Sequence, residues 1–409
     1  MKDTDQNLKN PEVQRQAAVF TKNAVDVIES KELEKRISKS LETKVPMRIK
    51  FGMDPSSPDL HIGHAIPLLK LRSLQELGHK IVLIVGDATA MVGDPSGRNK
   101  LRPQLTREAV ESNLITYTEQ AGRVLDLEAT EVRRNSEWFD AMSFEEVLRL
   151  AARMTVAQMV ERDTFQTRIQ ASEPIGIHEF LYPLMQGWDS VQVEADLEIG
   201  GNDQLFNLLV GRRLQEQEQQ IPQMCLTLPL INGLDGRKMS KSYGNSVGLT
   251  DEPNDMFGKV MSMEDSVMQA FFELLTPLAS DEIGALLAGH PREAKARLAQ
   301  EITTVFHDQA AGSGAREAFD RQFKEKQIPD DIPERVFEGE WGPEGVPFFA
   351  LIRSIGLAAT GSDARRVIQQ GGARIDGEVI KVPTQAIARP DAKMLVQVGK
   401  RKFAWVRAE

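Results

Sequence analysis

Several features that commonly fix the class of a protein are scarce or absent in this sequence of 409 residues. It has one cysteine, Cys225, which excludes a disulfide framework and any cysteine-rich zinc site. Its longest aliphatic run, residues 81–85, is far too short to cross a bilayer. The first seven residues lack the basic start and the apolar stretch of a signal peptide. We therefore expect a cytoplasmic protein that does not act at a membrane.

Two common nucleotide-binding loops are also absent. The sequence contains no Gly-x-x-x-x-Gly-Lys-Ser/Thr loop, which would cradle phosphates, and no Gly-x-Gly-x-x-Gly, which would bind a dinucleotide. It contains no internal repeat and no low-complexity tract. These absences leave the P-loop and dinucleotide-binding classes without support.

The charge is unevenly distributed along the chain. The formal net charge of −10 argues against a protein coated in basic surface for binding nucleic acid. Residues 346–409 nevertheless contain 11 Lys and Arg against 5 Asp and Glu, a net charge of +6, so the preceding 345 residues carry −16. An acidic body with a basic tail indicates a local contact with a polyanion. On charge alone, a small domain that merely happens to be basic is a fair alternative.

A chain of this length predicts two or three domains rather than one. Strand and helix patterns alternate in the first part, with strands at 47–52, 80–85, 191–199 and 226–231 and helices at 61–77 and 204–213. This alternation predicts an α/β fold with a doubly wound, Rossmann-like parallel sheet, whose ligands lie at the carboxyl ends of its strands. Residues 1–245 would form this catalytic domain, with a helical insertion at about 105–180.

Three further segments follow the predicted catalytic domain. Residues 246–327 carry helical patterns and predict an α-helical domain. Residues 328–345 are polar and rich in proline, which predicts a linker. Residues 346–409 predict a small α+β unit with a helix at 362–370 and strands around 375–379.

Two of the chain's six histidines fall in one tetrapeptide, His61-Ile62-Gly63-His64, where a predicted strand is followed by a helix. Three residues apart at a helix start, both imidazoles lie on one face, beside unpaired backbone N–H groups and the positive end of the helix dipole. They can donate hydrogen bonds to phosphate oxygens, and Gly63 leaves room for a base or a ribose. The alternative is a pair of histidines that simply packs at the start of the helix.

Residues 238–242, Lys-Met-Ser-Lys-Ser, lie on a polar loop between two glycines. Lys238 and Lys241, with two hydroxyl groups beside them, can neutralise a departing pyrophosphate and so stabilise charge that grows in the transition state. The histidines and the lysines together would hold the triphosphate of a nucleotide from two sides. An exposed basic turn is the alternative.

Tyr182, Gln186 and Asp189 are spaced so that a helix would present all three on one face. On an inward face, Asp189 and Gln186 would be costly to bury unless they met polar groups of a ligand. A helix with these polar residues in solvent is an equal alternative on spacing alone.

The pair of motifs His-Ile-Gly-His and Lys-Met-Ser-Lys-Ser resembles that of class I aminoacyl-tRNA synthetases, and the narrower resemblance is to the bacterial tyrosyl-tRNA synthetases. It extends over essentially the whole chain. Supporting stretches are Gly-Asp-Pro-Ser-Gly at 93–97, Leu-Tyr-Pro at 181–183 and Ile-Gly-Gly-Asn-Asp-Gln at 199–204. The basic C-terminal unit resembles an S4 RNA-binding domain through residues 363–372 and Ile-Asp-Gly at 375–377.

This resemblance implies a tyrosine–tRNA ligase, which joins L-tyrosine to ATP, releases pyrophosphate and transfers the tyrosyl group to the 3′ end of tRNA(Tyr). Mg²⁺ would accompany ATP through its phosphate oxygens, with no tightly bound protein metal. No covalent nucleophile is needed, because positioning and charge stabilisation carry the reaction. The resemblance also implies a homodimer with residues 154–162 at its interface, and tRNA binding by the helices of 251–325 and by the S4-like unit.

The resemblance assigns roles to individual residues. The implied catalytic residues are His61, His64, Lys238 and Lys241. The implied ATP contacts are His61, Gly63, His64, Gly201, Asp203, Lys238, Ser240 and Lys241. The implied tyrosine contacts are Gly52, Asp54, Asp94, Tyr182, Gln186, Asp189 and Gln204. Among these, Asp189 would accept a hydrogen bond from the substrate phenol, while Tyr182, Gln186 and Asp94 would hold its ammonium group.

Two positions depart from the better-known members of this family. Lys50 stands where those members place a tyrosine that helps to bind the phenol, so the second phenol contact is unassigned. Glu198 replaces a glutamine, which suggests membership of a distinct bacterial branch.

Three other functions compete with this interpretation. A tryptophan-specific synthetase is disfavoured by the S4-like tail and by Asp189. A small-molecule nucleotidyltransferase can share His-x-Gly-His but does not need the tRNA-binding domains. A catalytically idle RNA-binding protein built on a synthetase body is disfavoured by the intact histidines, the intact lysines and Asp203.

Overall fold

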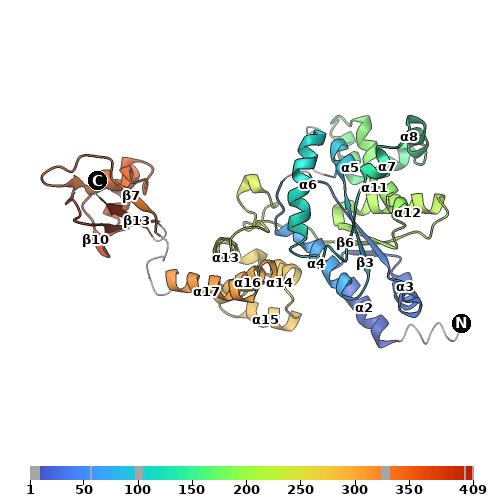
Figure 1. Cartoon of the computed structure of the whole chain (residues 1–409), viewed down its shortest axis with the longest axis horizontal. Coiled ribbons are helices and arrows are strands. Elements are labelled where there is room, and N and C mark those ends of the chain that lie inside the picture. Colours follow the sequence, from blue (N-terminus) through green and yellow to red (C-terminus); the bar gives the residue numbers. More distant parts are fainter. Residues whose placement is uncertain (1–9, 56–57, 97–104, 324–331, 400–401, 408–409) are drawn as a thin grey trace. The chain divides into compact units, whose positions relative to one another are not determined.

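The computed structural model describes residues 10–55, 58–96, 105–323, 332–399 and 402–407. The chain divides into two compact units, Met1–Phe319 and Asp320–Glu409, and each has its own buried core (Figure 1). Within the described ranges, no helix combines the length and the apolar character needed to cross a membrane.

A six-stranded sheet with the order β1-β6-β5-β2-β3-β4 forms the centre of the first unit. Its strands are β1 (Asp26–Ile28), β2 (Arg48–Met53), β3 (Lys80–Val85), β4 (Glu131–Arg134), β5 (Leu197–Gly201) and β6 (Met224–Leu228). β1 runs antiparallel to β6, and the other neighbours are parallel. The chain winds from β2 to β3 and β4 on one side, and through β5 and β6 on the other. The boundary between β2 and β5 is therefore the topological switch point of a doubly wound sheet.

Helices cover both faces of this sheet. Those next to the strands in sequence include α2 (Pro11–Thr21), α3 (Ser30–Thr43), α4 (Ile62–Glu76), α5 (Asp87–Val92), α11 (Leu181–Gln192) and α12 (Leu205–Gln217). In β3, Ile81 and Leu83 belong to the buried cluster that contains residues of α2, α3 and α4, whereas Val82 and Ile84 belong to another with Trp138. Because side chains alternate across a strand, these two clusters lie on opposite faces. The predicted doubly wound α/β sheet is confirmed.

The segment 105–180 is mostly helical, as expected, but it also contributes a strand to the sheet. Its elements are α6 (Arg107–Ala121), β4, α7 (Ser136–Phe139), α8 (Phe144–Ala151), α9 (Val156–Met159), α10 (Asp163–Gln170) and η1 (Ile177–Phe180). β4 pairs in parallel with β3, with Glu131 opposite Val82. Sequence reasoning missed β4 because it is only four residues long and mostly charged.

The strand predicted at 191–199 is wrong in its first half. α11 continues to Gln192, the chain turns at Glu194 with φ of 48°, and β5 begins only at Leu197. The alternation of Val191 and Val193 with polar residues imitated a strand. Both valines instead pack into buried clusters at the end of α11.

The helices after residue 245 pack into the same core as the sheet. They are α13 (Pro253–Met261), η4 (Asp265–Val267), α14 (Met268–Leu275), α15 (Ser280–Ala288), α16 (Pro291–Phe306) and α17 (Gln309–Phe323). Phe257, Phe271 and Ile302 are fully buried in the cluster that also contains Ile49 of β2 and Ile66 of α4. The segment predicted as a separate helical domain is therefore continuous with the sheet in one compact unit.

The second unit contains a five-stranded sheet with the order β10-β9-β12-β13-β7, a two-stranded pair of β11 and β8, and, among its described residues after 331, the helices α18 and α19. Its elements are β7 (Glu334–Val336), β8 (Val346–Pro347), α18 (Phe348–Ser354), α19 (Gly361–Gln369), β9 (Ala373–Ile375), β10 (Glu378–Ile380), β11 (Ala386–Ile387), β12 (Met394–Val398) and β13 (Lys402–Arg407). β9 and β10 form a hairpin through Asp376 and Gly377, both with positive φ, as a type I′ turn requires.

The predicted linker is partly a strand of this second unit. β7 pairs in parallel with β13, and Phe337 and Trp341 pack in the core of the unit. The prolines that predicted a linker flank an extended segment, and Pro333 O accepts a hydrogen bond from Trp405 N at 3.0 Å. The α+β unit therefore begins before residue 346.

Candidate active site

The predicted motifs meet at the carboxyl ends of the central parallel strands. β2 leads to Asp54 and then to α4, while β5 leads to Asp203 in η2 (Asn202–Gln204). Gly52 of β2 is exposed although its strand is central, and a Cβ built on it would meet no atom within 4 Å. Open space therefore lies over β2, at the switch point where a doubly wound sheet binds its ligand.

His61 and His64 cap the start of α4 reciprocally. Gly63 N donates a hydrogen bond to His61 Nδ1 at 3.2 Å, and His61 N donates one to His64 Nδ1 at 3.2 Å. The two ring centroids are 4.0 Å apart. Because both Nδ1 atoms are acceptors, each neutral ring carries its proton on Nε2. The fold thus fixes the tautomer whose Nε2–H group can donate to an anion.

Asn245 holds the backbone of the lysine loop, residues 238–242. This buried side chain donates to Asp235 Oδ1 at 2.7 Å and to Lys238 O at 3.1 Å, and it accepts from Ser240 N at 2.9 Å. The Lys238 side chain is exposed. Lys241 begins η3 (Lys241–Tyr243), and its side chain lies outside the part of the chain that the structure describes. A fixed backbone therefore presents Lys238 to solvent.

The histidine motif and the lysine loop are in contact. A Cβ at Gly63 would lie 3.4 Å from Met239 Sδ and 3.0 Å from His61 Cε1, so only glycine allows this approach without displacement. Ile62 N donates to Val247 O at 2.9 Å, which joins the start of α4 to the segment after the loop. His64 and Lys238 are 174 residues apart in the sequence, and the fold brings their two motifs together.

Tyr182 lies on the inward face of α11. Its hydroxyl donates to Asp54 Oδ2 at 2.7 Å, and Asp54 Oδ1 accepts from Thr89 Oγ1 at 2.8 Å. Burial, together with the nearby charges of Asp54 and Asp94, raises the pKa of Tyr182 well above its usual value. Tyr182 is therefore a protonated donor that links α11 to the end of β2.

Asp189 is buried two turns further along α11. It accepts hydrogen bonds from Trp138 Nε1 at 3.0 Å and from Asn135 Nδ2 at 3.4 Å. Burial raises the pKa of the Asp189 carboxyl to about 7, against the opposing effects of the Lys50 charge and of these two donors. A carboxylate at the bottom of a polar helix face can accept a further hydrogen bond from a ligand hydroxyl.

A chain of amides connects Asp94 to α11. Gln204 Nε2 donates to Asp94 Oδ2 at 2.8 Å, and Arg162 Nη2 lies 3.4 Å from Asp94 Oδ1. Asn207 Nδ2 donates both to Gln204 Oε1 and to Gln186 Oε1 at 2.8 Å. The alternative in which the face of α11 lies in solvent is wrong, because its polar residues belong to this internal network.

Lys50 is fully buried and all of its donors are used. Its Nζ donates to Gln186 O at 2.7 Å, to Ser190 Oγ at 2.8 Å and to Glu198 Oε1 at 2.9 Å. A lysine ammonium has three donors and no acceptor. Lys50 therefore has no donor left for a ligand in this arrangement.

One predicted motif falls partly outside the described residues. The stretch at 93–97 is described only as far as Ser96, whose backbone N donates to Asp94 Oδ1 at 2.8 Å. Among the residues that are described, no group of three or more His, Cys, Asp or Glu is arranged to hold a metal ion.

Sequence reasoning missed four polar residues of the site: Asn135, Trp138, Asn207 and Asn245. Asn135 directly follows β4, at the same carboxyl edge as the predicted residues, so recognition of β4 would have indicated it. Trp138, Asn207 and Asn245 act by supporting Asp189, Gln186 and the lysine loop. Nothing in their local sequence marks these long-range contacts.

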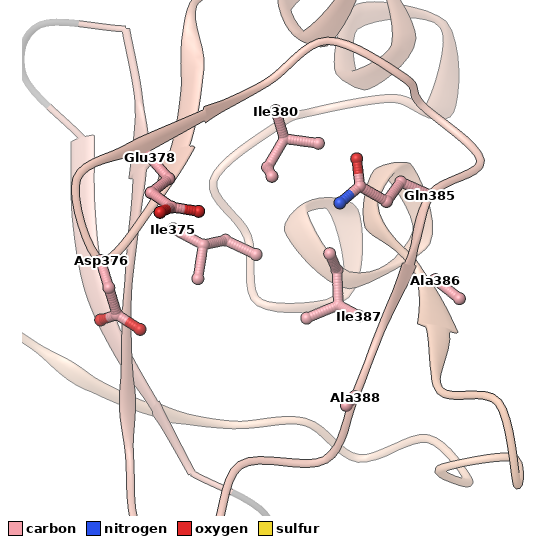
Figure 2. Close-up of a pocket in the computed structure, with 8 residues that line it drawn as sticks. All are labelled: Ile375, Asp376, Glu378, Ile380, Gln385, Ala386, Ile387 and Ala388. Atoms are coloured by element: carbon pink, nitrogen blue, oxygen red, sulfur yellow. The ribbon is translucent and has the colours of Figure 1, made fainter.

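A separate pocket of about 430 Å³ lies in the C-terminal unit. Figure 2 shows Ile375, Ile380 and Ile387 around it, with the carboxylates of Asp376 and Glu378 at one side. None of the predicted site residues lines it. Its acidic groups make it unsuited to a polyanion.

Comparison with known sequences gives one family. The family described as "tRNA synthetases class I (W and Y)" matches residues 42–324. A tyrosine–tRNA ligase of Syntrophotalea carbinolica is 46% identical over 404 residues, which cover 97% of this chain and 98% of that protein. A tyrosine–tRNA ligase of Burkholderia thailandensis is 49% identical over 399 residues, 96% of this chain and 95% of that protein.

Solved structures share the fold. The tyrosyl-tRNA synthetase of Archaeoglobus fulgidus, complexed with L-tyrosine, superposes with a TM-score of 0.59 at 21% identity, covering 74% of this chain and 99% of that one. A tryptophanyl-tRNA synthetase of Plasmodium falciparum superposes with a TM-score of 0.57 at 17% identity, covering 77% and 89%. At these identities the structural likeness supports the fold and does not separate tyrosine from tryptophan.

Proposed function

Because the chain belongs to the class I tRNA synthetases of the tryptophan and tyrosine type, we propose that it is a tyrosine–tRNA ligase. It activates L-tyrosine with ATP, releases pyrophosphate and transfers the tyrosyl group to the 3′ end of tRNA(Tyr). The observation that carries the choice of tyrosine is Asp189, a buried carboxylate held by two donors on the ligand-facing side of α11. Amino-acid-dependent exchange between ATP and pyrophosphate tests this function directly.

The ATP side of the site consists of donors and cations. In our proposal, the Nε2–H groups of His61 and His64 donate to the phosphates, and Lys238, Lys241 and Ser240 act on the departing pyrophosphate. Asp203 and Gly201, at the end of β5, contact the ribose, and Gly63 contacts ATP through its backbone, because its side is closed by His61 and Met239. Mg²⁺ would enter with ATP, bound through the phosphate oxygens of the nucleotide.

The amino-acid side combines carboxylates with amide and phenol groups. We propose that Asp189 accepts the phenol hydrogen and that Asp94, Tyr182 and Gln186 hold the ammonium, with Gln204 near the carboxylate. Gly52 and Asp54 complete the wall at the end of β2, where the open space over Gly52 admits the ligand. The tyrosine carboxylate then attacks the α-phosphorus of ATP in line, and no protein nucleophile is required.

We also propose that the protein acts as a homodimer. Large apolar side chains are exposed in the segment 144–177, notably Phe144 at 77%, Val156 at 68% and Ile177 at 85%. Exposed apolar side chains concentrated in one segment are typical of a surface that is covered by a partner. Arg162, at the end of the proposed interface segment 154–162, is buried beside Asp94 within its own chain.

An Ile177→Asp variant should be monomeric in solution. The introduced carboxylate would have to be buried in an apolar contact. The dissociation constant of the dimer should therefore rise by at least tenfold, on the order of 1.4 kcal/mol, and dimers at micromolar concentration should separate. Sedimentation equilibrium would give about 45.6 kDa for the variant, the mass of one chain, and twice this for the natural chain. Ile221→Asp, at a site 68% exposed outside the segment, is the control and should leave the mass unchanged. A dimeric Ile177→Asp variant would contradict the proposed interface.

Binding of tRNA is assigned to two regions, the helices of 251–325 and the basic C-terminal unit. The latter resembles an S4 domain and carries the positive end of the charge asymmetry. On its surface, Arg365 stacks over Phe349 at 3.8 Å and Arg366 pairs with Asp363, so α19 presents guanidinium groups. Guanidinium groups on one helix suit the phosphates of an RNA arm.

A chain that ends at residue 323 should separate activation from charging. It keeps the whole sheet and α13–α17 and removes the basic unit. Tyrosine-dependent exchange should stay within about threefold of the full chain, whereas charging of tRNA(Tyr) at physiological salt should fall by at least about tenfold. Charging at the full rate by this fragment would remove the C-terminal unit from the proposed mechanism.

A cytoplasmic location completes the proposal. Cys225, the single cysteine, is buried and forms no disulfide, which suits a reducing compartment. It is not one of the proposed site residues.

A further inference from the structure

Among the ion pairs of the described residues, Lys50–Glu198 is buried completely on both sides, with Nζ and Oε1 2.9 Å apart. Burying two charges is costly, and an apolar pair of similar volume would often stabilise a protein as well. The pair is therefore weak evidence for stability. Its contacts indicate what it does instead.

The pair joins the elements that build the amino-acid site. Lys50 belongs to β2, which ends below the open space at Gly52, and Glu198 belongs to β5. Lys50 also donates to Gln186 O and to Ser190 Oγ, both on α11. Strands from both sides of the switch point are thus tied to the helix that selects the amino acid.

Glu198 is as fully used as Lys50. Besides Lys50, it accepts hydrogen bonds from Gln186 Nε2 at 3.1 Å, from Ser190 Oγ at 3.1 Å and from Gln223 Nε2 at 2.5 Å. All three donors of Lys50 are used, both oxygens of Glu198 accept hydrogen bonds, and both side chains are fully buried. Any effect on the substrate must therefore pass through α11.

We propose that Lys50 and Glu198 are positioning residues for amino-acid selection, which fix α11 so that Gln186 and Asp189 meet the bound tyrosine at the correct depth. This inference rests on the proposed function. The charges support it, because Lys50 lowers the pKa of Asp189 and Glu198 raises it, while Trp138 and Asn135 are the other groups that face this carboxyl. Lys50 thereby favours the charged form of Asp189, the form that accepts the phenol hydrogen in the proposed function.

The test compares Lys50→Met, Glu198→Gln and the double variant by exchange kinetics with tyrosine and with phenylalanine, alongside thermal unfolding. Lys50→Met should raise the KM for tyrosine by about tenfold and reduce the preference over phenylalanine, with the KM for ATP within about twofold. The double variant should recover thermal stability, because no charge is left unpaired, but should keep the raised KM for tyrosine. Glu131→Gln, which breaks the pair between Arg48 of β2 and Glu131 of β4, is the control and should change neither KM.

A folded double variant with the natural KM and the natural discrimination would overturn the proposal. If the Lys50 variants do not fold, Ser190→Ala decides, because it removes a hydrogen bond to each member of the pair without removing a charge. It should raise the KM for tyrosine by about threefold, and an unchanged value would overturn the proposal equally. Absence of tyrosine-dependent exchange in the natural chain would instead contradict the proposed function, so the two failures are distinguishable.

Discussion

A Lys238→Ala variant should lose at least about 100-fold in the rate of tyrosine activation, because a cation aimed at the departing pyrophosphate acts mainly in the transition state. The KM for tyrosine should change little, since Lys238 lies on the loop that packs beside the histidine motif and not on α11. Pre-steady-state formation of tyrosyl-adenylate, followed with saturating ATP, measures this loss.

The matched control for Lys238 is its neighbour. Arg237 is an exposed cation in the same turn, but it pairs with Asp235 at 2.5 Å and stacks over Tyr243 at 5.3 Å. Arg237→Ala should therefore reduce the rate by no more than about threefold. Equal losses in both variants would mean that the loop needs positive charge in general, and the role assigned to Lys238 would be withdrawn.

An Asp189→Ala variant should lose its preference for tyrosine over phenylalanine by at least about 100-fold. A site built to hydrogen-bond a hydroxyl rejects the analogue that lacks it by about 10⁴-fold or more, and tyrosyl-tRNA synthetases are themselves the known example of this effect. Removing the acceptor removes the penalty for phenylalanine. The ratio of kcat/KM for the two amino acids measures the change.

Asp87 provides the control for burial. It is a buried aspartate that accepts from Ser136 N at 2.9 Å and from Ser136 Oγ at 2.6 Å, outside the face of α11. Asp87→Asn should lower stability and keep the preference for tyrosine. Unchanged discrimination in Asp189→Ala would refute the phenol contact.

The pKa of Asp189 predicts a pH dependence with a definite sign. The carboxyl titrates at about 7 in the free protein, so it is neutral below this pH and a charged acceptor above it. Since kcat/KM reports the free enzyme, the preference for tyrosine over phenylalanine should rise as pH increases through about 7. Because burial has raised this pKa from its ordinary value of 3.8 to about 7, the protein loses stability as pH rises between these two values, and this group causes no further loss above about 7.

The parts of the fold that were predicted correctly carry their signal locally. The apolar run at 81–85 is β3, and the periodic segment after the histidine motif is α4. β4 and β7 were missed because each is short, polar and stabilised by pairing with a strand that is distant in sequence. The strand expected at 191–199 failed because alternation also fits a helix end that packs on both sides.

The candidate site was also predicted only in part. Spacing placed Tyr182, Gln186 and Asp189 on one helix face, and the family resemblance was needed to predict that this face points to a ligand. Spacing could not indicate that Trp138 and Asn135 support Asp189, or that all three donors of Lys50 are used within the protein. Such contacts depend on the packing of residues that are 51 to 148 positions apart in the sequence.

The proposed function requires a site that selects tyrosine and activates it with ATP. Exchange of labelled pyrophosphate into ATP, measured with the full chain and Mg²⁺ in the presence of tyrosine, tryptophan or phenylalanine, tests this choice most directly. We predict rapid exchange with tyrosine and, at equal concentrations, exchange lower by about 10⁴-fold with phenylalanine and near background with tryptophan. No exchange with tyrosine, or faster exchange with tryptophan, would contradict the account.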